Sequence, residues 1–420
     1  MPKHKSLLKS IKNYLQKLGP GLVTGASDDD PSGIATYSQA GAQFGTKLLW
    51  TAIVTYPLMV VIQEMCARIG IVTKQGLTGT IRRYYSPYLL YGVLLVSFPS
   101  IVLNIGADIA GMGAVGNLLF PSIPSFYFSI GFTILLLYAI IVWPYHKISL
   151  VLKWLCITLF SYILIPFLIH TDWPTVLAHA VVPQIVNDKA YFVMLVGILG
   201  TTISPYLFFW QASMEVEEVH AKHLVVDKKI IKDMKSDVKG GMLFTNIVFF
   251  FIILTSGMVL FKAGIHEINT VEEAAKALQP LAGDFAYLLF AVGVIGTGFL
   301  AVPVLGGSLS YMMAETFGWQ EGLNKKFHQA PGFYLTMMVS LVVGLTINFV
   351  GISPIQALIY TAVLYGITAP ILIALLLHIC NQSRIMGEFT NDSWSNALGG
   401  LTLVLMTLAA GVLLYYQFID

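Results

Sequence analysis

Long apolar stretches, separated by short polar segments, cover almost all of this 420-residue chain. A helix needs about 20 mostly apolar residues to cross a bilayer, and eleven stretches reach that length. We therefore predict membrane helices over residues 19–44, 47–71, 88–117, 124–145, 148–170, 189–219, 240–263, 283–314, 331–351, 354–380 and 396–418. The strict alternation that is typical of membrane strands is not seen, so the predicted class is an all-α membrane protein.

Composition supports a lipid environment. The chain is 56% hydrophobic and 11% charged, whereas soluble domains carry about 25% charged residues. A net charge of +2 gives no reason to expect a nucleic-acid partner. The sequence contains no P-loop, GxSxG or HExxH motif. We expect a transporter that works as a monomer in the bilayer, with neither enzymatic activity nor a bound cofactor.

The lysines and arginines predict the orientation. If the segments alternate from a cytoplasmic N-terminus, all but four of the 24 basic residues fall on the inner side; the outer four are Lys47, Lys189, Lys262 and Lys276. The segment 1–18 is then cytoplasmic, and an odd number of helices places the C-terminus outside. The segment 212–239 is expected to be the end of a helix and a solvated cytoplasmic loop. A compact chain of this kind fits a bacterial inner membrane or plasma membrane.

Two predicted helices are interrupted at corresponding positions. The first is broken at DDDPSG, around Pro31, and the second at ISPY, around Pro205 and Tyr206. Proline removes a backbone donor, and the freed carbonyls are tolerated only inside protein or beside a wet cavity. Matching breaks indicate an inverted-repeat transporter. The expected organisation is a first repeat of five helices, a second repeat of five and one additional helix, over residues 19–171, 189–381 and 396–418.

The acids at the first break are the main candidates for binding a cation, because charge inside a membrane is costly and usually functional. Asp30 lies beside the freed carbonyls and is the best candidate ligand. Successive helical residues turn by 100°, so Asp28 and Asp29 should point elsewhere, into an aqueous vestibule where they attract cations. The alternative for one of them is a helix cap or an ion pair.

The remaining polar groups at the breaks are oxygens, among them the hydroxyls of Ser32, Thr201, Thr202 and Ser204. A ligand set made only of oxygens suits hard cations such as Mg²⁺, Ca²⁺ or Mn²⁺. Two further acids lie within predicted helices. Asp108 either relays protons or ions or has a structural partner. Glu64 is either on the same pathway or forms an ion pair with Arg68, four residues later.

Four segments resemble the natural resistance-associated macrophage protein (NRAMP) family of divalent-metal transporters. They are GPGLVTGASDDDPSGIATYSQAGAQFGTKLLW (19–50), QEMCARIGIVTKQGL (63–77), DIAGMGAVGNLLF (108–120) and GILGTTISPY (197–206). The resemblance implies a LeuT-type fold, a 5+5 inverted repeat with broken helices one and six. It also implies metal binding by Asp30 and by the backbone carbonyl of Thr201.

The chain departs from this family's motifs where selectivity is decided. The family motif Asp-Pro-Gly-Asn reads Asp30-Pro31-Ser32-Gly33 here, and Met-Pro-His reads Ser204-Pro205-Tyr206. These changes resemble the NRAMP-related branch that moves magnesium. Mg²⁺ retains much of its water, and the small residues Gly33 and Ser204 leave room for that water. The expected function is a carrier of Mg²⁺ or Mn²⁺.

Two alternatives remain open on the same fold. A coupled carrier of amino acids or other small organic solutes would use the freed helix ends for a carboxylate and Asp30 for the coupling ion. A sensor or scaffold that transports nothing would use neither.

Overall fold

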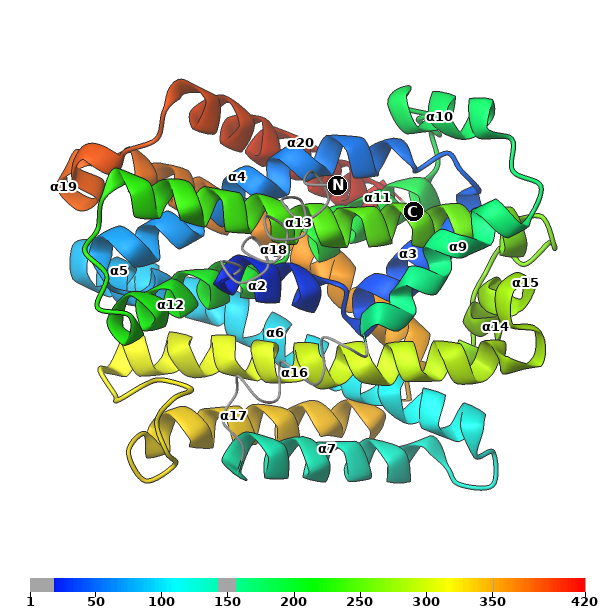
Figure 1. The fold of residues 1–420 in the computed structure, drawn as a ribbon, viewed down its shortest axis with the longest axis horizontal. Helices are drawn as coiled ribbons and strands as arrows, with labels where there is room; N and C mark the ends of the chain where they lie inside the picture. Colours follow the sequence, from blue (N-terminus) through cyan, green and yellow to red (C-terminus); the bar gives the residue numbers. More distant parts are fainter. Residues whose placement is uncertain (1–18, 143–155, 350, 420) are drawn as a thin grey trace, which may run out of the picture.

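The computed structural model describes residues 19–142, 156–349 and 351–419, and all regular elements in these ranges are helical. Neighbouring long helices pack side by side in one bundle (Figure 1). The predictions made for residues 1–18, for the basic residues in 143–155 and for the start of the fifth helix lie outside the described residues.

The described helices account for the eleven predicted crossings. Eight are long and apolar enough to span a bilayer, two more are shorter apolar helices, and the broken pair at the start of the chain is the eleventh. In order they are α2 (Pro20–Asp28) with α3 (Pro31–Phe44), α4 (Trp50–Thr73), α6 (Pro87–Leu119), α7 (Ser125–Val142), α9 (Ser161–Leu168), α11 (Lys189–Thr202) with α12 (Pro205–Ala221), α13 (Lys228–Ser256), α16 (Ala286–Phe317), α17 (Pro331–Leu345), α18 (Pro354–Asn381) and α20 (Ser393–Ile419).

Short helices connect these crossings at the two ends of the bundle. They are α5 (Leu77–Tyr84), α10 (Trp173–Val181), α14 (Val271–Ala275), α15 (Gln279–Ala282) and α19 (Ser383–Met386). Of these, α14 and α15 lie at the opposite end of the bundle from α5 and α19 (Figure 1).

The charged segment 212–239 is more ordered than predicted. Most of it is helical, because α12 continues to Ala221 and α13 begins at Lys228. Asp227 caps α13 by accepting a hydrogen bond from the backbone N–H of Ile230 at 2.7 Å. Ile231, Met234 and Val238 recur at helical spacing and are buried, so this polar helix end packs on the protein rather than extending into solvent.

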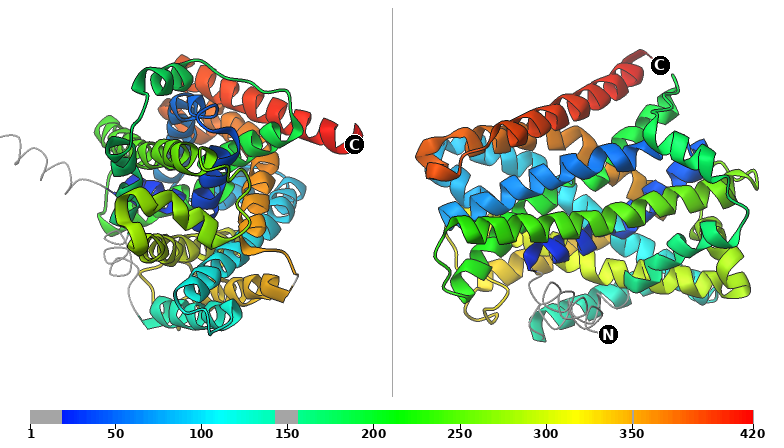
Figure 2. Two further views of the ribbon diagram at one scale, coloured as in Figure 1. Left: turned by 90° about the vertical axis from the view of Figure 1, so that its right-hand side faces the viewer. Right: turned by 45° about the horizontal axis from the view of Figure 1, so that its top comes forward.

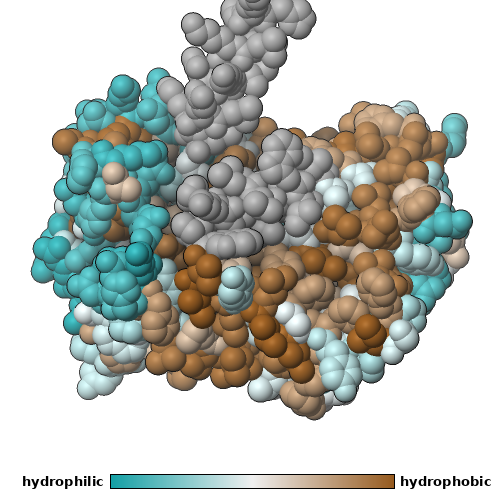
Figure 3. Space-filling view, turned by 60° about the horizontal axis from the view of Figure 1, so that its bottom comes forward, coloured by the Kyte–Doolittle hydropathy of each residue, from teal (hydrophilic) through white to brown (hydrophobic). Residues whose placement is uncertain are grey.

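Polar and apolar surfaces are segregated along the bundle. Figure 3 shows hydrophilic side chains gathered at one end and an apolar surface beside them. In Figure 1 that end carries α5, α19 and the connection between α12 and α13. The last helix, α20, runs along the outside of the bundle (Figure 2), and one side of it is exposed apolar surface that includes Val404 and Leu408. A lipid-facing apolar band with a polar end is the arrangement expected of a multi-pass membrane protein.

The helices around the breaks pack backbone to backbone. A Cβ added at Gly200 of α11 would lie 2.0 Å from the carbonyl oxygen of Ala362, and one at Gly366 of α18 would lie 2.4 Å from that of Val196. Small residues allow such close approach in membrane bundles, where dispersion contacts rather than the hydrophobic effect hold helices together.

Replacing Gly200 by alanine should separate α11 from α18 and lower the free energy of unfolding by about 1–3 kcal/mol, because the added methyl group overpacks a backbone contact. Gly131→Ala in α7 is the matched control: nothing lies within 4 Å of a Cβ there. The control should be neutral or stabilising by up to about 1 kcal/mol. Thermal unfolding in detergent compares the two variants, and equal stabilities would contradict the proposed close packing.

Candidate functional site

The first break places two acids outside regular helix. α2 ends at Asp28, Asp29 follows as its C-cap with φ −82° and ψ 52°, and α3 starts at Pro31. Asp30 is the N-cap of α3, and its Oδ1 accepts a hydrogen bond from the backbone N–H of Gly33 at 2.7 Å. Proline at the first helical position suits the helix start, since that N–H has no partner within the helix.

The second break satisfies its freed carbonyls with its own side chain. The Ser204 hydroxyl, between α11 and α12, lies 2.6 Å from the carbonyl oxygen of Thr201 and 3.2 Å from that of Gly200. The Thr201 carbonyl, expected to bind metal, therefore accepts a hydrogen bond in this structure. A carbonyl oxygen has two lone pairs, so this contact leaves one for a cation.

The two breaks meet in the core. The Tyr206 hydroxyl donates to the carbonyl oxygen of Ser27 at 2.9 Å. A Cβ at Gly33 would lie 3.3 Å from both the Asp28 carbonyl oxygen and the Thr201 Oγ1. Asp30, Thr201 and Ser204 are each 2% exposed. The structure therefore brings the predicted residues of both breaks into one closed region.

Asn104 of α6 is a member of this site that the sequence analysis missed. Its Nδ2 donates to Asp30 Oδ2 at 3.0 Å, and its Oδ1 accepts from the Thr361 hydroxyl of α18 at 2.9 Å. Both Asp30 oxygens thus have partners, and α3, α6 and α18 are linked through the Asp30 carboxylate and the Asn104 amide. A buried asparagine one turn before Asp108 was the available sequence signal.

Asp28 and Asp29 are arranged differently from the expectation. Both reach Thr245 of α13, whose hydroxyl lies 2.8 Å from Asp29 Oδ1 and 3.5 Å from Asp28 Oδ2. They converge because Asp29 has left helical geometry, so the 100° rotation no longer separates them. They are 1% and 0% exposed, so in this structure they lie in protein and not in an aqueous vestibule.

Asp108 is fully buried on α6. Among the described residues no side chain hydrogen-bonds to its carboxylate oxygens, which interact with the backbone N–H of Ser32. It lies close enough to Asp30 for their charges to interact. The structural pairing considered for Asp108 is therefore not observed, and a role in moving ions or protons stays a prediction.

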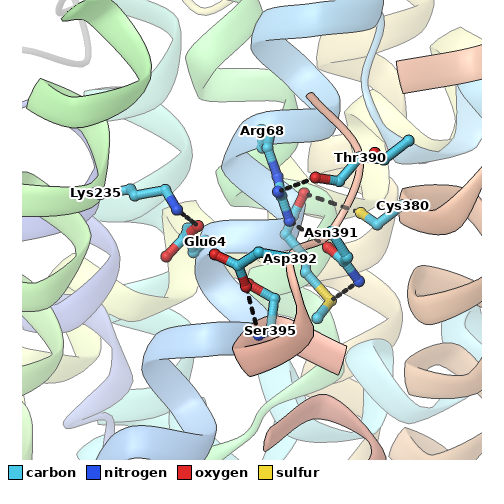
Figure 4. Close-up of polar contacts among 9 residues, drawn as sticks. Glu64, Arg68, Lys235, Cys380, Thr390, Asn391, Asp392 and Ser395 are labelled. Carbon is cyan, nitrogen blue, oxygen red and sulfur yellow. Dashed lines mark hydrogen bonds and ion pairs between the residues drawn. The ribbon is translucent and has the colours of Figure 1, made fainter. Parts of the chain in front are cut away.

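The predicted ion pair between Glu64 and Arg68 is wrong. Glu64 pairs with Lys235 of α13 at 2.6 Å. Arg68 instead donates to the Thr390 carbonyl oxygen at 3.3 Å and to Asn391. Figure 4 shows the two side chains pointing to these different partners. The partner of Glu64 comes from the charged start of α13, and the partners of Arg68 come from the connection before α20. Both segments are distant in sequence, so the spacing within α4 did not reveal these contacts.

Two cavities lie away from the breaks, toward the polar end. One of about 790 Å³ is bordered by α5, α12, α16 and residues 318–325. The other, of about 410 Å³, adjoins the start of α2, and its charged lining consists of four acids and Lys222, which pairs with one of them; the acids are Glu215, Glu218, Asp233 and Asp237. No group of three or more His, Cys, Asp or Glu side chains in the described ranges is arranged to hold a metal ion.

Comparison with known proteins identifies relatives over the whole chain. The family model "Natural resistance-associated macrophage protein-like" (Nramp) matches residues 21–416. The divalent metal cation transporter MntH of Caldanaerobacter subterraneus subsp. tengcongensis is 26% identical, covering 96% of this chain and 94% of that protein. The MntH of Clostridium acetobutylicum is 23% identical, covering 98% and 94%.

Solved structures agree on the fold. The manganese transporter of Eremococcus coleocola superimposes with a TM-score of 0.74 at 20% identity, covering 95% of this chain and 86% of that one. MhsT in complex with L-phenylalanine superimposes with a TM-score of 0.66 at 12% identity, covering 94% and 98%. The LeuT-type fold and its two broken helices, expected from the sequence, are thereby confirmed.

A partly buried acid beside the larger cavity predicts a pH effect on stability. Burial, with the nearby charges of Glu315 and Glu217, raises the pKa of Glu321 to about 9. Because this pKa lies above the unfolded value of about 4.3, its stabilising contribution is complete below that value and is lost as the pH rises toward 9. Glu321→Gln should therefore lose less stability than the wild type between about pH 6 and 9. The exposed Glu272→Gln is the control, and thermal unfolding at both pH values is the measurement.

The hydrogen bond from Tyr206 to the Ser27 carbonyl predicts a loss of stability when the hydroxyl is removed. Tyr206→Phe leaves the buried Ser27 carbonyl without its donor and should destabilise the protein by about 1–3 kcal/mol. Tyr360→Phe, at a side chain 57% exposed on α18, should change stability little. If chemical or thermal unfolding gives the same loss for both, the Tyr206 hydroxyl does not hold the two breaks together.

Proposed function

Because this chain belongs to the natural resistance-associated macrophage protein-like (Nramp) family, we propose that it is a secondary transporter of divalent metal cations. The observation that carries the proposal is a buried carboxylate, Asp30, at the meeting point of two broken helices. The relatives named divalent metal cation transporters support it. The transported ion is the substrate, and no catalytic step or cofactor is invoked.

Asp30 is the proposed charged ligand. Its fixed hydrogen bonds to the Gly33 N–H and to Asn104 hold its carboxylate in one orientation. The Thr201 carbonyl and the Ser204 hydroxyl provide neutral oxygens nearby. Bringing a divalent cation next to Asp30 offsets the cost of a buried negative charge, which makes the site attract cations and disfavour anionic solutes.

The residues at the breaks favour Mg²⁺ or Mn²⁺ over softer metals. Position 33 lacks a side chain and position 204 carries a short hydroxyl, so neither imidazole nor thioether faces the ion from these positions. Hard cations prefer oxygen ligands, and Mg²⁺ in particular binds through one or two carboxylates while retaining water. A Cβ at Gly33 would lie 3.3 Å from two oxygens. This close packing is opened when the helices separate to admit a hydrated ion.

Alternating access is proposed to occur by movement of the half-helices. In this structure α2 is held at its start by Asp237 of α13, which accepts from the backbone N–H groups of Gly19 at 2.9 Å and Gly21 at 2.7 Å. Thr24 is held by Gln211 of α12 at 2.5 Å. Opening toward the polar end requires these contacts to break. We place that end, with the N-terminus, in the cytoplasm, following the distribution of basic residues.

The test is uptake of Mg²⁺ and Mn²⁺ into liposomes that contain the purified full-length protein. Asp30→Ala should lower uptake at least about 100-fold, beyond the effect of about 10–100-fold expected for an outer-shell residue. Asp284→Asn, in the exposed turn before α16, is the matched control and should keep wild-type uptake. The ratio of the two ions reports selectivity.

One outcome would reject this function, and another would reject only the assignment of Asp30 as the ligand. If sealed liposomes with folded wild-type protein took up neither ion, the divalent-cation proposal would be wrong. The organic-solute alternative would then be tested by screening amino acids, since that carrier responds to solutes and ignores divalent ions. Unchanged uptake in Asp30→Ala would place the cation elsewhere.

A further inference from the structure

Four carboxylates are buried around the first break: Asp28, Asp29, Asp30 and Asp108 are each at most 2% exposed. The ion pairs among the described residues include none of them. Transfer of an uncompensated carboxylate into protein is strongly unfavourable. One divalent cation compensates two negative charges, so four carboxylates in their ionised form would accommodate more positive charge than a single transported ion brings.

The acids separate into two groups by the helices that they face. Both oxygens of Asp30 are engaged toward α3 and α6, by the Gly33 N–H and by Asn104. Asp28 and Asp29 face α13 instead and share the Thr245 hydroxyl. Their other oxygens, Asp28 Oδ1 and Asp29 Oδ2, are buried and have no hydrogen-bond partner in the described ranges.

The packing of α2 on α13 builds this second group. Gly21, Gly25 and Asp29 recur every four residues along one side of α2 and its end, and Asp237, Gly241 and Thr245 do so on α13. A Cβ at Gly21 would lie 2.8 Å from Asp237 Oδ2, and one at Gly25 would lie 2.2 Å from the Gly241 carbonyl oxygen. The third pair of this ridge is Asp29 with Thr245. Two glycine contacts therefore fix the register that brings the carboxylates to the hydroxyl.

We propose that Asp28, Asp29 and Thr245 form a second divalent-cation site, separate from the transported-ion position at Asp30. Two carboxylates balance the charge of one divalent ion, and the hydroxyl contributes a neutral oxygen. The coordination is completed by water, as Mg²⁺ and Mn²⁺ sites with few protein ligands allow. This inference rests on the proposed function, because it assumes that divalent cations reach the break.

Asp28 and Asp29 lie between Asp30 and the body of α2, whose start is at the polar end. From these acids, α2 leads back to the acidic cavity at its own start, which is lined by Glu215, Glu218, Asp233 and Asp237. An ion leaving Asp30 along α2 thus meets a pair of carboxylates before it reaches that cavity. A cation in the second site compensates the negative charge of Asp28 and Asp29 and strengthens the contact of α2 with α13.

The experiment counts Mn²⁺ bound per chain by equilibrium dialysis of the full-length protein in detergent. The wild type should bind two ions. The double variant Asp28→Asn/Asp29→Asn keeps side-chain size and should bind one, and Asp30→Asn should also bind one. Asp28→Asn/Asp29→Asn should in addition raise the unfolding temperature without metal, because it removes uncompensated buried charge.

Thr245→Val keeps all four acids and tests the hydroxyl alone. It should weaken one of the two binding events at least about 10-fold, the lower end of the range for removal of even an outer-shell partner of a metal, and leave the other unchanged. Thr133→Val is the matched control, because its hydroxyl bonds only within α7, to the Ser129 carbonyl.

The outcomes separate this proposal from the function on which it rests. One bound ion in the wild type, unchanged in Asp28→Asn/Asp29→Asn, would overturn the second site and leave transport at Asp30 intact. Two ions in Asp30→Asn together with normal uptake would instead overturn Asp30 as the ligand of the transported ion, whereas a folded wild type that takes up neither ion would overturn the proposed function. Two ions in the wild type, with one lost in each acidic variant, support both.

Discussion

The structure depends on one constraint, that backbone groups freed inside an apolar bundle need partners. Each break meets it in a different way. At the first, the Asp30 carboxylate accepts the N–H of Gly33, and at the second the Ser204 hydroxyl donates to the Thr201 carbonyl. Tyr206 then joins the breaks by donating to the Ser27 carbonyl. The residues that hydrogen-bond to the freed backbone groups are therefore the same residues that surround the candidate ion position.

Buried charge is the second consequence of this arrangement. The acids around the first break are held without basic partners among the described residues, whereas Glu64, closer to the polar end, has Lys235. If a basic side chain neutralised these acids, a transported cation would have no uncompensated negative charge to bind. The acids instead hydrogen-bond to neutral groups, such as the Thr245 hydroxyl and the Asn104 amide, and so keep their negative charge available to a cation.

The sequence predicted the framework well because length and proline are strong local signals. Apolar stretches defined the crossings, and Pro31 and Pro205 located the breaks. Long-range polar partners could not be predicted in the same way. Asn104 lies 74 residues from Asp30, and Thr245 lies 216 residues from Asp29. Nothing in either local sequence identifies the other. The Glu64–Arg68 prediction failed because suitable spacing shows that two side chains are able to meet, while Lys235 and Asn391 offered them better partners.

The small residues along α2 connect this local chemistry to movement. Gly21 and Gly25 place α2 in backbone contact with α13, so the half-helix is held by dispersion contacts and by a few hydrogen bonds at its ends. At these two positions α2 has no side chain to disengage from α13 when the half-helix tilts. The polar contacts of Asp237, Thr24 and Asp29 then decide how tightly α2 is held. Because Asp29 is one of the acids at the break, the charge of these acids and the position of α2 are physically coupled.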